Sequence, residues 1–148
     1  MPSLMVFLVL VILTSMFGAA FRPGPWYDEL VKPALNPPGW IFSPVWLTLY
    51  AMIAIAGWQA WKKTRSLSSP VTILWCSQLV LNALWSWLFF GLQRPGLAFM
   101  DIIILLAVII AFIRLAWPVS RPASFLFMPY ALWVGFAAYL NLGIVVLN

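Results

Sequence analysis

The sequence contains no histidine, one cysteine and only three acidic residues among its 148 residues. Without histidine the chain cannot build a Ser-His-Asp triad, a histidine-based zinc site or a histidine-ligated haem. A single cysteine forms no intramolecular disulfide. Three carboxylates argue against a paired-carboxylate hydrolase and against a carboxylate metal site. We therefore expect no metal site and no required cofactor.

Charge is scarce as well, because 7% of the residues are charged whereas 65% are hydrophobic. A typical soluble domain has about 25% charged residues, and a chain of this length cannot hide so much apolar surface in one core. The composition predicts an integral membrane protein, and it excludes a soluble enzyme, a disordered chain and a disulfide scaffold. The net charge of +5 is then a sign of membrane orientation and not of a nucleic-acid partner.

Long apolar stretches are what the sequence has in abundance. Five of them reach, or nearly reach, the about 20 residues of a membrane-spanning helix. A backbone in lipid must satisfy its hydrogen bonds internally, so the stretches predict helices. We expect an all-α integral membrane protein, a five-transmembrane-helix bundle that forms a single membrane domain over residues 1–148. The predicted helices cover about residues 4–21, 40–61, 71–92, 97–117 and 125–147.

The first apolar stretch and the linker after it each have a feature that sets them apart from the rest of the chain. Residues 4–21 could be a cleaved signal peptide, but no Lys or Arg precedes the apolar run, which argues against cleavage. Residues 22–39 hold five of the twelve prolines. Proline fixes φ, so we predict an ordered proline-rich loop that acts as a lid over one mouth of the bundle.

Lys and Arg divide unequally between the two ends of the predicted bundle. The positive-inside rule places the end with more of them in the cytoplasm. We therefore expect the N-terminus in the cytoplasm and the C-terminus outside. The larger group is Lys62, Lys63, Arg65, Arg114 and Arg121, and the smaller group is Arg22, Lys32 and Arg94.

Polar residues in the third predicted helix indicate a site. Gln78, Asn82 and Ser86 recur at every fourth position, so they lie near one helix face. Unpaired amides are costly in lipid, and this face should therefore meet other helices or a cavity. This reasoning leaves two roles open for the polar face, interhelical hydrogen bonding and ligand binding.

Aromatic residues beside small ones indicate a stacking surface in two other helices. Trp46 and Tyr50 share a face of the second predicted helix, and Trp133, Ala137 and Asn141 share a face of the fifth. The alternative is an ordinary aromatic belt at the membrane interface. The pattern favours a flat, lipophilic and partly polar ligand.

Asp101 is the single carboxylate inside a predicted helix. Near the start of its helix it is favoured by the helix dipole. We expect it to form a structural ion pair with Arg94 or with a cation of the first loop, in preference to a catalytic role.

Motifs along the whole chain resemble those of one family, the translocator protein / tryptophan-rich sensory protein (TspO) family. Its first loop and second helix are similar to Trp26-Tyr27-x-x-Leu30-x-Lys32-Pro33, Asn36-Pro37-Pro38-x-Trp40 and Pro44-Val45-Trp46-x-x-Leu49-Tyr50. Its third and fifth helices resemble Gln78-Leu79-x-Leu81-Asn82-x-x-Trp85-Ser86 and Pro129-Tyr130-x-x-Trp133-x-x-Phe136-Ala137-x-x-Leu140-Asn141.

The resemblance implies a multi-pass protein of a bacterial cell membrane, a homodimer in the lipid bilayer, with a pocket under the first loop. It implies a receptor or regulator in tetrapyrrole metabolism that binds porphyrins, above all protoporphyrin IX, or other flat lipophilic ligands. A light- and oxygen-dependent porphyrin-degrading enzyme that uses Trp46 and Trp133 is the alternative, and a transporter of small lipophiles is the second alternative. By resemblance and spacing together, the ligand-binding residues are Tyr27, Pro38, Trp40, Trp46, Tyr50, Asn82, Ser86, Trp133, Ala137 and Asn141.

Overall fold

The computed structural model describes residues 3–148, and all regular structure in that range is helical. The all-α prediction is confirmed. A 3-10 turn, η1 (Gly39–Ile41), leads into the third helix, and a π-helical segment, η2 (Trp87–Gly91), follows the fourth. The α-helices are α1 (Leu4–Ala19), α2 (Pro25–Glu29), α3 (Phe42–Thr64), α4 (Pro70–Ser86), α5 (Pro95–Ala116) and α6 (Arg121–Leu147).

Four helical segments are long and apolar enough to cross a membrane. The remaining predicted crossing, residues 4–21, corresponds to α1, which is apolar but has only 16 residues. At 1.5 Å per residue it spans about 24 Å, less than the about 30 Å of a hydrocarbon core. The multi-pass prediction is confirmed, whereas the count of five crossings is not. The four segments are Gly39–Thr64, Pro70–Gly91, Pro95–Ala116 and Arg121–Leu147.

The helix ends follow local sequence signals. Pro70 and Pro95 are the first residues of α4 and α5, where a missing backbone N–H costs nothing. At the other end of α3, Arg65 adopts the left-handed conformation and closes the helix. The Ser120 hydroxyl accepts a hydrogen bond from the Ala123 N–H at 3.4 Å and caps α6.

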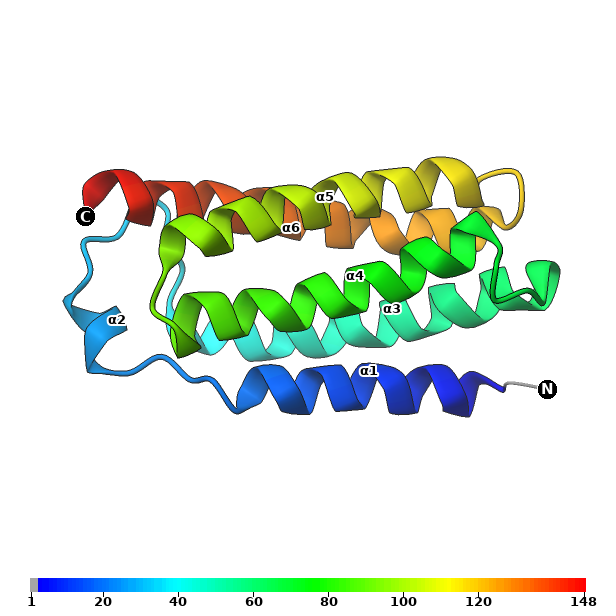
Figure 1. The fold of residues 1–148 in the computed structure, drawn as a ribbon, viewed down its shortest axis with the longest axis horizontal. Helices are drawn as coiled ribbons and strands as arrows, with labels where there is room; N and C mark the ends of the chain where they lie inside the picture. Colours follow the sequence, from blue (N-terminus) through cyan, green and yellow to red (C-terminus); the bar gives the residue numbers. More distant parts are fainter. Residues whose placement is uncertain (1–2) are drawn as a thin grey trace.

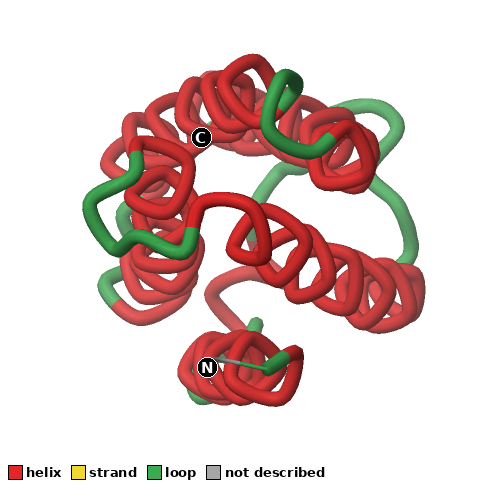
Figure 2. The backbone as a smooth tube through the Cα atoms, turned by 90° about the vertical axis from the view of Figure 1, so that its right-hand side faces the viewer, coloured by secondary structure: helices red, strands yellow, loops and turns green. Residues whose placement is uncertain are grey.

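The long helices run side by side, and the start of α1 and the end of α6 lie at opposite ends of the bundle (Figure 1). Viewed from the end that carries the N-terminus, α1 lies to one side of the remaining helices (Figure 2). It packs on α3 and α4, while α6 packs on α3 and α5. Gly57 permits the contact with α1 and α4, because a Cβ there would lie 2.5 Å from the Trp75 indole and 2.8 Å from the Phe7 ring.

The first loop crosses one end of the bundle, as Figure 1 shows. The sequence predicted no helix within residues 22–39, but the structure places α2 there. From α2 the chain passes the C-terminal end of α6 and then turns into α3. The loop therefore touches several helices at the end of the bundle where a lid was predicted.

Candidate functional site

A chain of buried hydrogen bonds joins α3, α4 and α6. The Tyr50 hydroxyl donates to Asn82 Oδ1 at 3.2 Å, and Asn82 Nδ2 donates to the Tyr130 hydroxyl at 2.9 Å. The Tyr130 hydroxyl in turn donates to Gln78 Oε1 at 2.9 Å. Tyr130 and Gln78 are fully buried, and Asn82 is 6% exposed. The polar stripe predicted on α4 thus makes interhelical hydrogen bonds at two of its three positions.

Aromatic rings from α3 and α6 gather beside this chain. The Trp46 ring lies 5.3 Å from the Tyr50 ring and 6.4 Å from the Tyr130 ring, measured between centroids. The Trp133 ring lies 5.7 Å from the Phe42 ring. We call these five residues, Phe42, Trp46, Tyr50, Tyr130 and Trp133, the aromatic seam. Each of the two predicted tryptophans therefore contacts a ring across the interface of α3 and α6: Trp46 that of Tyr130, and Trp133 that of Phe42.

The aromatic seam contains a polar atom that the protein does not satisfy. The Trp133 Nε1 atom is buried and has no hydrogen-bond partner among residues 3–148. An indole N–H in an apolar setting normally finds an acceptor. A ligand with a hydrogen-bond acceptor would supply one at this position.

Sequence reasoning missed two members of the seam. Tyr130 belongs to the fifth-helix motif and lies three residues before Trp133, so helical spacing alone places both on one face. Phe42 lies four residues before Trp46 and shares its face in the same way. Both signals were present in the sequence, but spacing alone does not distinguish these two aromatic residues from those of an ordinary core.

Ser86 does not lie with Gln78 and Asn82. Its Oγ lies 3.3 Å from where a Cβ on Gly18 would be, so the side chain lies against α1. Each step of four residues turns an α-helix by about 40°, which places Ser86 about 80° from Gln78. The predicted three-residue stripe is thus divided between two interfaces, and a ligand contact by Ser86 stays a prediction.

Asn141 makes contacts that tie helices together. It is 1% exposed, its Oδ1 accepts from Trp85 Nε1 at 2.9 Å, and its Nδ2 donates to the Pro95 carbonyl at 2.9 Å. Ala137, one turn earlier on α6, is half-buried against the hydrophobic core. Ligand contacts of Asn141 and Ala137 stay predictions, and both polar atoms of the Asn141 side chain already have a protein partner.

The predicted lid residues do not converge on the aromatic seam. Trp40 is 75% exposed and Pro38 is also exposed. The Tyr27 ring packs on the rings of η2, 5.7 Å from Phe90. Burial raises the pKa of the Tyr27 hydroxyl, while a hydrogen bond with the Asn36 side chain lowers this pKa and the nearby Asp28 charge raises it. Tyr27 is therefore a neutral packing residue of the lid in this structure.

The structure contradicts the ion pair that was predicted for Asp101. It is 5% exposed, and both carboxylate oxygens lack a hydrogen-bond partner among the described residues. Arg94 is exposed and caps the start of α5. Seven residues of α-helix separate the two by about 10 Å along the axis, so the exposed guanidinium does not reach the buried carboxylate. The prediction of an ion pair was wrong because it ignored the depth of Asp101.

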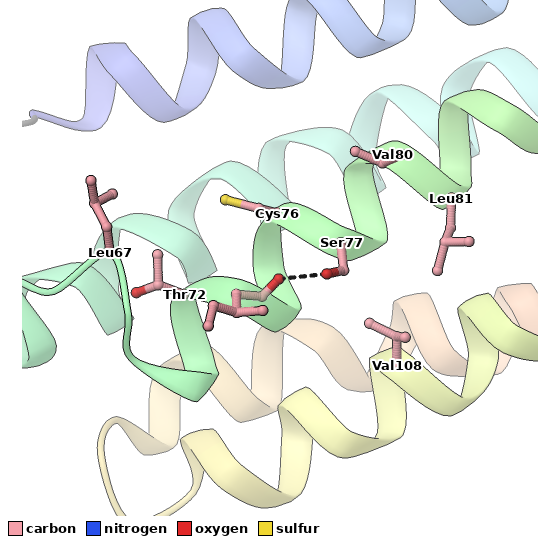
Figure 3. A pocket seen from close by; sticks show the side chains of 8 residues that line it. Leu67, Thr72, Cys76, Ser77, Val80, Leu81 and Val108 are labelled. Carbon is pink, nitrogen blue, oxygen red and sulfur yellow. Dashed lines mark hydrogen bonds between the residues drawn. The ribbon is translucent and has the colours of Figure 1, made fainter.

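Two shallow grooves lie elsewhere, on the flanks of α4. One, of about 620 Å³, runs between α4 and α5, and Figure 3 shows its lining from Leu67 to Val108 with exposed Cys76. The other, of about 560 Å³, lies between α1 and α4. No charged side chain lines either groove. Their apolar linings match what lipid tails contact, and they contain none of the seam residues.

The chain is similar to a group of known membrane proteins. The TspO/MBR family model matches residues 4–147. The tryptophan-rich protein TspO of Chlorobaculum tepidum is 41% identical over 138 residues, which cover 88% of this chain and 86% of that relative. The tryptophan-rich protein TspO of Archaeoglobus fulgidus is 39% identical over 144 residues, 95% of this chain and 94% of its own. The translocator protein of Ovis aries is 40% identical over 128 residues, 84% and 73% of the two chains.

Proposed function

The chain belongs to the TspO/MBR family, and on that premise we propose that it is a membrane receptor or regulator in tetrapyrrole metabolism. Its ligand in this proposal is a porphyrin, with protoporphyrin IX as the probe of choice, or another flat lipophilic molecule. The ligand lies at the aromatic seam between α3 and α6, under the first loop.

One observation carries this proposal. The buried Trp133 Nε1 has no acceptor among residues 3–148, and the Trp133 ring of α6 packs on the Phe42 ring of α3. Ring faces offer stacking to a planar ligand, and offset or edge-to-face contacts add about 0.5–1.5 kcal/mol per pair. A planar molecule with acceptor atoms therefore satisfies both features of the seam.

The chemistry of the chain favours a free-base porphyrin over haem. No histidine is present to ligate iron. Porphyrin propionates need cationic or N–H partners, and Lys32 lies in the first loop, where its ammonium donates to the Tyr27 and Leu30 carbonyls at 2.9 and 3.3 Å. A propionate at this position would replace a neutral acceptor with a charged one, which strengthens the hydrogen bond.

The membrane topology in this proposal has five crossings, with the N-terminus in the cytoplasm. Figure 1 shows that α1 begins at the end of the bundle opposite to the one where α6 ends, and this supports an odd number of crossings. In this proposal α1 is the fifth crossing beside the four longer segments, either in a locally thinned bilayer or with help from flanking residues. A homodimer is proposed from the family resemblance.

A second candidate function is the light- and oxygen-dependent breakdown of a bound porphyrin. The close contact of Trp46 with the rings of Tyr50 and Tyr130 favours it, because it places electron-rich side chains beside the proposed ligand. In this case Trp46 and Trp133 are the catalytic residues.

A titration of the purified protein with protoporphyrin IX separates these functions. The measurement follows the porphyrin absorption band, first in the dark and then under illumination in air. Saturable binding with a band that is stable in light supports a receptor. Loss of the band only in light, at a rate above that of porphyrin in empty detergent, supports the enzyme. An absence of saturable binding would overturn both the receptor and the enzyme. In a separate experiment, flux of porphyrin into sealed vesicles would indicate a transporter.

A further inference from the structure

Residues 31–34 of the first loop, which we call the strap, lie against the last turns of α6. The Asn148 side chain pairs with both backbone groups of Val31: the Val31 N–H donates to Oδ1 at 3.0 Å, and Nδ2 donates to the Val31 carbonyl at 2.8 Å. Nine residues earlier, the Tyr139 hydroxyl donates to the Ala34 carbonyl at 2.8 Å. Side chains of α6 thus hold the first and last residues of the strap.

A notch in α6 receives the middle of the strap. Pro33 is buried, although the residues on both sides of it in the loop are more exposed. A Cβ on Gly143 would lie 2.5 Å from Pro33 Cβ and 2.6 Å from Pro33 Cγ. Glycine at this position of α6 is therefore what allows the proline ring to approach the helix.

The loop has a second attachment of a different kind. Trp26 and Tyr27 of α2 pack on the η2 rings, with 5.7 Å between the centroids of Trp26 and Phe89 and of Tyr27 and Phe90. Phe89 is 2% exposed, so this attachment is apolar and buried. The strap, in contrast, buries only the Pro33 ring and otherwise depends on hydrogen bonds at exposed positions, where water competes for both partners. The strap is therefore the part of the loop that is easier to release.

The strap also lies between this apolar attachment and the start of α3. After it the chain passes through Leu35, which has a φ of 70° and is 79% exposed, and reaches Phe42 of the aromatic seam. Only seven residues of chain, numbers 35–41, connect the strap to Phe42, so movement of the strap can reach the seam.

We propose that the strap is releasable, and that Tyr139, Gly143 and Asn148 are positioning residues that set how fast a ligand reaches and leaves the aromatic seam. The proposal rests on the proposed function, since it concerns access to the same site. The α2 attachment to η2 stays closed in this scheme, so that the loop opens at its α6 side.

Hydrogen exchange of the strap tests the attachment without any ligand. We expect Gly143→Ala to raise the exchange rate of the Val31 amide by between about twofold and tenfold, the range that weakening one or two exposed hydrogen bonds predicts. The matched control is Gly135→Ala on the same helix, because a Cβ there meets no atom within 4 Å. Equal exchange in the two variants would show that the strap does not depend on the notch.

Stopped-flow binding of protoporphyrin IX tests the control of access. We expect Asn148→Ala to speed ligand release by a similar factor, and Asn148→Asp to have a smaller effect because it keeps the acceptor for the Val31 N–H. Higher strap exchange with unchanged ligand rates would overturn the proposal while the proposed function survives. If the unchanged protein binds no porphyrin, the proposed function fails and control of access fails with it.

Discussion

Replacing Tyr130 with phenylalanine tests the hydrogen-bond chain at its centre. The substitution keeps the ring, which contacts Trp46 and Phe127, and removes only the hydroxyl. Two buried groups then lose their partners, Asn82 Nδ2 and Gln78 Oε1. Gln78 already carries an unpartnered Nε2 in the structure, so its whole amide becomes unsatisfied.

The expected cost comes from two interhelical hydrogen bonds. Such bonds average about 0.6 kcal/mol and reach about 1.7 kcal/mol in membrane bundles, because the unfolded chain in a membrane also finds partners. Two of them give about 1–3 kcal/mol for Tyr130→Phe. The upper half of this range is expected, because both abandoned groups stay buried and each pays a desolvation cost.

Thermal or SDS-induced unfolding in detergent measures this loss. The matched control is Tyr139→Phe on the same helix, whose hydroxyl makes one hydrogen bond at an exposed position. We expect a smaller loss from this control. A second variant, Tyr130→Phe with Gln78→Met, should recover part of the stability, because removing both partners leaves fewer unsatisfied groups. If Tyr130→Phe were as stable as the unchanged protein, the hydrogen-bond chain would not stabilise the bundle.

Two further predictions concern helix packing. Gly57→Ala should destabilise the bundle by about 1–3 kcal/mol, because its Cβ would lie 2.5 Å from the Trp75 indole. Gly135→Ala should leave stability unchanged or raise it. The unfolding midpoints of the two variants in one assay test this prediction, and equal midpoints would refute it. Trp85→Phe should cost about 1 kcal/mol through loss of its hydrogen bond to Asn141, and the same assay would refute the assignment if the midpoint did not fall.

The helices could be predicted from the sequence because lipid leaves the backbone few choices. A long apolar run in a membrane must be helical, so the four long segments were found with small errors at their ends. The short helix α2 was missed, because five residues between prolines carry no periodic pattern. The π-helical turn η2, with its Leu92 N–H to Trp87 carbonyl bond, was missed as well, since such turns are rare interruptions of an otherwise helical pattern.

The site could be predicted only in part, and the reason is helix rotation. Spacing by four residues correctly grouped Trp46 with Tyr50 and Gln78 with Asn82, because two residues one turn apart stay near one face. Over two turns the deviation becomes large enough to move Ser86 to another interface. The burial of Asp101 without a hydrogen-bond partner could not be predicted either, because a sequence shows which charges exist but not how deeply each is buried.

The most direct test of the ligand site is the affinity of the seam variants for protoporphyrin IX, followed by the absorption band of the porphyrin itself. This readout does not depend on tryptophan emission, so Trp46→Phe and Trp133→Phe can be compared with the unchanged protein. Trp117→Phe is the matched control, because Trp117 belongs to the turn that connects α5 to α6. This turn lies at the end of the bundle away from the first loop (Figure 1). We predict weaker binding in both seam variants and unchanged binding in the control. Equal affinity in all four proteins would contradict a ligand site at the aromatic seam.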